Sequence, residues 1–136
     1  MARLPDWDER LFAVVEAHDG IAFAWGRADC CTFAAACVEA VTGTRPYPDE
    51  VGRYRGLAGS RRRLRARGFT SIADGVAALF PEIAPVMAGR GDLGIVQRGA
   101  SETIVVGVGP RFITLAPSGG FEAVRHDQLS RAYRVG

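Results

Sequence analysis

The chain has 136 residues, of which 48% are hydrophobic and 24% are charged, and its formal net charge is +2. These values are typical of one soluble globular domain spanning residues 1–136, and so small a net charge argues against a nucleic-acid-binding protein. No stretch approaches the ~20 apolar residues of a membrane span, and the acidic, Pro-containing first nine residues do not have the pattern of a signal peptide.

Helices are expected in the first half of the chain, where apolar residues recur at helical spacing between capping residues. The first is expected from Pro5 to about His18, and the second has Gly43 as its stop. Ser60 and Ser71 are the expected N-caps of two shorter helices. The expected ranges are 5–18, 30–42, 60–68 and 71–79, with a long loop over residues 45–59.

From Gly91 onward the pattern changes to short, β-branched segments bounded by turn residues. The expected strands cover residues 93–97, 103–108, 111–116 and 121–124, and the tail over residues 128–135 is either a closing strand or a short helix. The fold class is therefore α+β, with N-terminal helices packed on a C-terminal antiparallel β-sheet.

The most informative segment is F-A-W-G-R-A-D-C-C-T over residues 23–32. Asp29 is a typical N-cap residue, so Cys30 is expected in the first helical turn. Unpaired N–H groups and the helix dipole stabilise a thiolate there and lower its pKa. A cysteine in an Ala-rich helix is also commonly a core residue. The position predicts either a nucleophile or a buried thiol.

The three cysteines, Cys30, Cys31 and Cys37, all fall within this one helix. Adjacent residues project about 100° apart, and Cys37 lies roughly 10 Å along the axis from Cys30. We therefore expect free thiols in a reducing compartment and no disulfide. No pair of His or Cys residues has zinc-ligand spacing, so neither a metal nor a cofactor is expected.

The order of these motifs resembles the NlpC-type cell-wall cysteine peptidases, small papain-like domains that cleave peptidoglycan peptides. The turn W-G-x-x-D-C precedes a helix, and Gly91-Asp92-Leu93 precedes the sheet, as in that family. The hairpin V-V-G-V-G over residues 105–109 also matches. The resemblance covers residues 23–116 and implies a papain-like NlpC-type fold in which Cys30 is the nucleophile.

Three residues of the turn are expected to support Cys30, namely Trp25, Gly26 and Asp29. Trp25 either shapes a substrate groove or anchors the packing of the turn. Gly26 is expected to supply a turn with positive φ.

The chain is also similar to a smaller, divergent branch of that group, encoded among the tail genes of tailed phages and phage-like particles of GC-rich bacteria. The matching segments are L-P-D-W at 4–7, F-A-W-G-R-A-D-C at 23–30 and R-A-Y-R-V-G at 131–136. This resemblance implies a virion component at or near the tail tip, or a tail-assembly protein, made in the bacterial cytoplasm. Its partners are then other tail proteins and, for a hydrolase, a bacterial cell-wall peptide, with no membrane.

The match fails at the catalytic base. A nucleophilic cysteine needs a base within hydrogen-bond reach and a third group that orients it. The family's histidine falls on Ser101 in this chain, beside Glu102, and its third polar residue falls near Thr114. Glu102 is a carboxylate alternative, although its charge would raise the thiol pKa. His126 is a candidate base if a hairpin brings it beside the Cys30 helix.

The other histidine, His18, sits at a helix C-terminus, where a partial positive charge is favourable, and needs no further role.

Three hypotheses therefore stand. The first is a phage-tail structural protein with a degenerate NlpC-like fold. The second is an active peptidoglycan hydrolase, a cysteine peptidase or amidase with Cys30 as nucleophile and His126 as base. The third is an adaptor that binds an acidic partner through the cluster Arg61–Arg67, which is otherwise a solvated helix face or a subunit contact.

Overall fold

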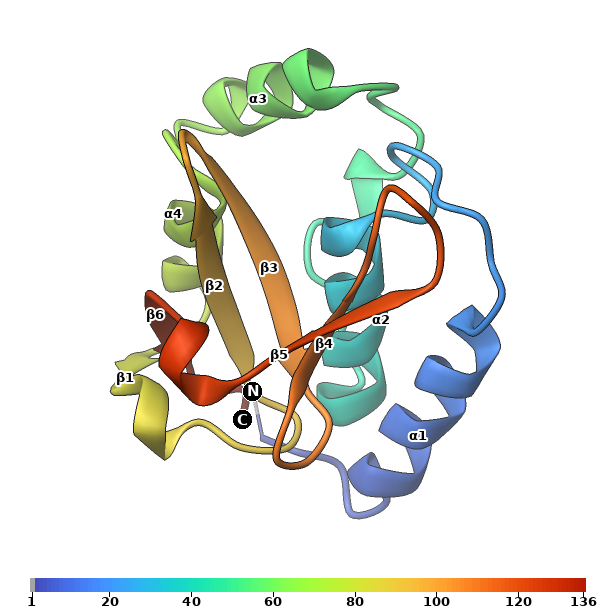
Figure 1. Cartoon of the computed structure of the whole chain (residues 1–136), viewed down its shortest axis with the longest axis vertical. Helices are drawn as coiled ribbons and strands as arrows, with labels where there is room; N and C mark the ends of the chain where they lie inside the picture. The colour runs from blue at the N-terminus through green and yellow to red at the C-terminus, as the bar shows by residue number, and fades with distance from the viewer. Residues whose placement is uncertain (1) are drawn as a thin grey trace.

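The structure, a computed structural model, describes residues 2–136. It is α+β, as expected. The helices are α1 (Trp7–His18), α2 (Cys30–Thr42), α3 (Leu57–Ala66) and α4 (Ile72–Ala77). Residues of α1, α2 and α4 pack in the main core against a twisted antiparallel sheet, and α3 crosses the top in Figure 1. Short 3-10 turns are η1 (Pro48–Glu50), η2 (Pro85–Met87) and η3 (His126–Gln128).

The sheet has six strands in the order β1-β6-β2-β3-β4-β5, and every pairing is antiparallel. The strands are β1 (Glu82–Ile83), β2 (Leu93–Arg98), β3 (Ser101–Gly107), β4 (Phe112–Leu115), β5 (Phe121–Val124) and β6 (Arg131–Tyr133). The tail forms a closing strand, because β6 inserts between β1 and β2. Strand β1 has only two residues and was not expected.

Two helix starts differ from the expectation. Helix α1 begins at Trp7, since residues 5 and 6 form a turn before it. Helix α3 begins at Leu57 with Gly56 as N-cap, one turn before Ser60. The hydroxyl of Ser60 donates to the carbonyl of Leu57 at 2.8 Å and does not cap the helix. Serine inside a helix commonly binds a carbonyl of the preceding turn in this way.

Helix α4 is capped by Ser71 as expected, because its hydroxyl accepts from the backbone N–H of Asp74 at 3.2 Å. A reciprocal contact from the Asp74 side chain to the N–H of Ser71, which would complete a capping box, is absent from the described contacts. The Asp74 carboxylate accepts instead from the N–H of Thr70 at 2.9 Å. The helix also ends at Ala77, two residues earlier than expected.

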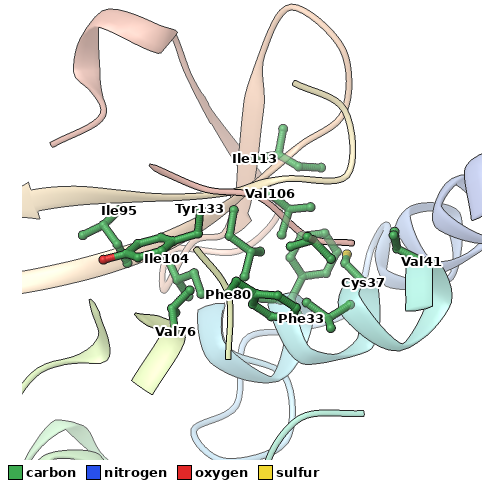
Figure 2. Close-up of a cluster of buried hydrophobic side chains, with 14 of the residues drawn as sticks. Phe33, Cys37, Val41, Val76, Phe80, Ile95, Ile104, Val106, Ile113 and Tyr133 are labelled. Atoms are coloured by element: carbon green, nitrogen blue, oxygen red, sulfur yellow. The ribbon is translucent and has the colours of Figure 1, made fainter. Parts of the chain in front are cut away.

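The main core lies between α2 and the sheet (Figure 2). Phe33, Cys37 and Val41 from one face of α2 pack against the side chains that alternate along β3 and its neighbours, including Ile104 and Val106. The opposite face of the sheet buries a second, smaller cluster: Ala88, Val96, Val105, Phe112, Val124, Leu129 and Ala132. Successive strand residues point to opposite faces, so each of these strands contributes to both clusters.

Asp92, in the Gly-Asp-Leu element, joins the two ends of the chain. Its buried carboxylate accepts from the guanidinium of Arg3 at 2.9 Å and from the N–H of Val135 at 3.0 Å. The other oxygen accepts from the N–H of Gly89 at 2.9 Å. Strand β2 begins at the next residue, Leu93. Asp92 therefore bonds both chain ends to the start of this strand.

Among residues 2–136, no helix is both long and apolar enough to cross a membrane.

Candidate functional site

The start of α2 is held by a reciprocal capping box. The carboxylate of Asp29 accepts from the backbone N–H of Thr32 at 2.8 Å, and the hydroxyl of Thr32 accepts from the N–H of Asp29 at 2.8 Å. Asp29 is therefore the N-cap that the sequence predicts, and Cys30 is the first residue of the helix. Only 1% of Asp29 is exposed, so the cap is part of the protein interior.

A second set of contacts ties this cap to the loop before α3. The other carboxylate oxygen of Asp29 accepts from the N–H of Gly26 at 2.8 Å and from the hydroxyl of Tyr54 at 2.6 Å. Gly26 has a φ of 78°, and a Cβ there would lie 2.4 Å from the carbonyl oxygen of Tyr54. Glycine is therefore required twice at this position, by conformation and by close approach.

Trp25 is half-buried and packs edge-on against Phe23, with ring centroids 5.2 Å apart. It does not line the apolar cavity described below. Its ring contact with Phe23 lies within the turn itself.

Cys30 is a half-buried residue, and its sulfur lies 3.9 Å from the sulfur of Cys31. The hydrogen bond from Cys31 lowers the pKa of Cys30, against the opposing effects of burial and the Asp29 charge. Backbone groups of Ile104 and Cys31 also favour the thiolate. The pKa of Cys31 is raised, because its proton is held by Cys30 and its side chain is buried. Of the two thiols, Cys30 is therefore the one that ionises more readily.

His126 does not lie beside Cys30. Its Nε2 is 2.7 Å from the carbonyl oxygen of Ala88, and its ring packs edge-on against Phe112 at 5.0 Å. Ala88 and Phe112 belong to the cluster on the sheet face that α2 does not cover. After the β4–β5 hairpin, η3 folds over the second cluster. His126 therefore lies on the sheet face opposite α2, where it cannot act as a base for Cys30.

Two of the three candidate positions for catalytic partners, Ser101 and Glu102, are engaged elsewhere. The hydroxyl of Ser101 accepts from Arg61 at 2.9 Å, and the carboxylate of Glu102 accepts from the N–H of Ala73 in α4 at 3.2 Å. Thr114 is buried, and its hydroxyl has no hydrogen-bond partner among the described residues. None of the three hydrogen-bonds to Cys30, whose neighbour on β3 is the apolar Ile104.

His18 packs against α2, the helix that begins at Cys30, although the sequence assigned it no role. Its ring lies edge-on against Phe33 of α2, with centroids 5.1 Å apart, and its Nδ1 is 2.8 Å from the carbonyl oxygen of Val14. No described hydrogen bond joins it to Cys30.

Two arginines of the cluster Arg61–Arg67 form ion pairs within the chain. Arg63 and Arg67 both bind the carboxylate of Glu50 at 2.7 Å. Hydrogen bonds from Arg63 and Arg67, in that order of importance, lower the pKa of Glu50 to about 2. Arg67 also lies over the ring of Tyr47, 4.9 Å from its centroid. These contacts fasten α3 to the loop that carries Tyr54.

A protein-family model described as "Domain of unknown function (DUF6950)" matches residues 2–135. The chain belongs to this family. No curated protein matches it.

In this DUF6950 domain an apolar cavity of about 160 Å³ lies between α2, α3, α4 and the loop before α3. Its wall includes Cys31, Ala35, Val51, Leu64, Leu79 and Ile104. Cys31, but not Cys30, lies in this wall. Within residues 2–136, no three His, Cys, Asp or Glu side chains are grouped closely enough to hold a metal ion.

Proposed function

We propose that this chain is a structural protein of a phage tail or phage-like particle, built on an NlpC-type papain-like fold that lacks its catalytic base. Three features support the fold assignment. Helix α2 begins at Cys30, it packs on an antiparallel sheet, and Gly91-Asp92-Leu93 leads directly into β2.

The proposal that catalysis has been lost rests on which groups hydrogen-bond to Cys30. Attack of a thiolate on an amide expels an amine, which must receive a proton; in Cys-His enzymes the imidazole supplies it. The groups that hydrogen-bond to Cys30 are Cys31 and the backbone of Ile104. With His126 on the opposite face of the sheet, no imidazole of the described chain is bonded to this thiol.

The assignment to a tail rests on the resemblance of residues 4–7, 23–30 and 131–136 to tail-module proteins. It is tested by mass spectrometry of purified particles from a host that encodes this chain. The chain should co-purify with intact particles at fixed stoichiometry and be absent from tail-less particles. Its absence from intact particles would overturn the proposal.

The lost catalysis is tested in the same particles with Cys30→Ala, using Cys37→Ala as the control, because Cys37 is a free thiol of the same helix outside the Cys30–Cys31 pair. Both variants should assemble and infect as wild type does. Loss of infectivity confined to Cys30→Ala would show that the thiol performs chemistry.

The lowered pKa of Cys30 favours one second candidate, a peptidoglycan hydrolase that acts through this thiolate. Purified wild-type chain incubated with peptidoglycan should release no new amine if the structural proposal holds. Release that disappears in Cys30→Ala would favour the hydrolase. The adaptor hypothesis has less support, because Arg63 and Arg67 are already paired with Glu50.

A further inference from the structure

We propose that copies of this chain associate head to tail, with the exposed phenyl ring of Phe12 in one copy entering the apolar cavity beneath α3 of the next. The inference goes beyond a structural role in a tail, because it names the partner and the contact. It does not depend on the chemistry of Cys30.

Phe12 supplies the side chain that is inserted in this contact. It lies on the outer face of α1, turned away from the core that Leu11 enters, and is 57% exposed. Of the aromatic residues in the described chain, only Phe12 is exposed; the others are buried or half-buried. An aromatic side chain left in water on a helix surface is available to a partner.

Acidic side chains surround this ring. Glu9 and Glu16 stand three residues before and four residues after Phe12, so both flank it on the same helix face. Both are exposed, as is Asp19 beyond the end of α1. The surface around Phe12 is therefore an apolar ring within a negatively charged border.

The cavity has the size and lining that a phenyl ring requires. An apolar protein cavity of about 150 Å³ accepts benzene, and this cavity measures about 160 Å³. Two residues of its wall, Val51 and Leu79, are 43% and 38% exposed. The cavity therefore reaches the surface between the η1 loop and α4.

The charge around the cavity complements that of α1. Residues 45–67 contain eight arginines and two acidic residues, a net charge of +6. The remaining residues contain nine arginines and thirteen acidic residues, a net charge of −4. Arg45, Arg63, Arg67 and Glu50 line the cavity itself. Glu50 pairs with Arg63 and Arg67, so one carboxylate is set against three arginines at the cavity wall. The acidic α1 face of one copy is thus attracted to the basic α3 side of another.

The two surfaces lie at separate parts of the molecule. In Figure 1, α1 is at the lower right and α3 crosses the top. A contact between two different surfaces leaves one Phe12 and one cavity free after each addition, so it builds rings or filaments. A repeating assembly of this type suits a component of a tail.

Sedimentation velocity of the purified full chain, up to about 0.1 mM, tests the proposal. The mass should rise with concentration, and added salt should weaken the association. Phe12→Ser should weaken it at least about tenfold. Ala35→Leu, which fills the cavity without changing charge, should act similarly. The control Val86→Ser removes a side chain that is 78% exposed on η2, outside both surfaces, and should leave association unchanged.

Mixing the two variants gives the decisive result. Phe12→Ser retains the cavity and Ala35→Leu retains the ring, so the mixture should form a one-to-one heterodimer that grows no further. Benzene is the independent probe: it should raise the Tm of wild type and Phe12→Ser and should dissociate wild-type oligomers. Monomeric wild type over the whole concentration range, or unchanged association of Phe12→Ser, would overturn the proposal. If Ala35→Leu does not fold, failure of benzene to dissociate wild type would also overturn it.

Discussion

Tyr54 donates its hydroxyl proton to the carboxylate of Asp29 at 2.6 Å, across a sequence separation of 25 residues. Asp29 caps the helix that begins at Cys30, so the loop before α3 is fastened to the start of α2. Through Gly26, whose carbonyl accepts from the N–H of Gly52 at 2.9 Å, the same turn is fastened to that loop a second time. The Trp-Gly-x-x-Asp-Cys turn therefore acts as a structural junction.

Tyr54→Phe should destabilise the domain, because it removes a hydrogen bond to a buried carboxylate. Hydrogen bonds to charged groups contribute about 1.5–3 kcal/mol, and neutral ones about 0.5–1.5 kcal/mol. Tyr47→Phe is the matched control, because Tyr47 donates to the neutral carbonyl of Gly75 at 2.7 Å. Urea denaturation should show the larger loss for Tyr54→Phe. Equal losses would mean that Asp29 does not depend on this hydroxyl.

Gly26→Ala should be much more destabilising than a change of conformation alone explains. Gly20 has nearly the same φ, 80°, but nothing lies within 4 Å of its added Cβ. Gly20→Ala should therefore cost about 1–2 kcal/mol, the penalty of left-handed backbone. Gly26→Ala adds a 2.4 Å clash with the Tyr54 carbonyl oxygen, and we expect a loss above about 4 kcal/mol. Similar unfolding midpoints for the two variants would contradict the close approach.

Cys31→Ala should raise the pKa of Cys30, because the Cys31 thiol is the main group that stabilises the Cys30 thiolate. Alkylation of Cys30 by iodoacetamide, followed by mass spectrometry, should then begin at higher pH than in wild type. Cys31→Ser keeps a donor at this position and should leave the pH profile closer to that of wild type. A profile unmoved by Cys31→Ala would place the stabilisation of the thiolate elsewhere.

Glu50→Gln should remove a pH-dependent contribution to stability. The folded pKa of Glu50 is about 2, below the value of about 4.3 for an unfolded chain. Its contribution is therefore complete above the unfolded pKa and is lost as the pH falls toward 2. Wild type should be more stable than Glu50→Gln near neutral pH, and the difference should shrink in acid. Urea midpoints measured from neutral pH to below pH 3 check this, and a constant difference would contradict it.

Features set by a few neighbouring residues were predictable from the chain alone. The Asp29 cap and the Gly43 stop bound α2 as expected, because capping groups act within one helical turn. Strand β5 has the expected bounds, and β2 begins at the expected Leu93. Local chemistry likewise placed Cys30 at a helix N-terminus.

Only the tertiary structure decided what stands around that thiol. The sheet face to which His126 folds depends on strand register, and a shift of one residue would exchange the two faces. No local pattern marked Tyr54 as the partner of Asp29, or β1 as the partner of β6. Those contacts join distant segments, and they form only because folding buries their polar groups together and each group then requires a partner. The amino-acid sequence determined where Cys30 begins its helix and that Cys31 stands beside it. The packing of distant segments determined that His126 lies on the other face of the sheet and does not bond to this thiol.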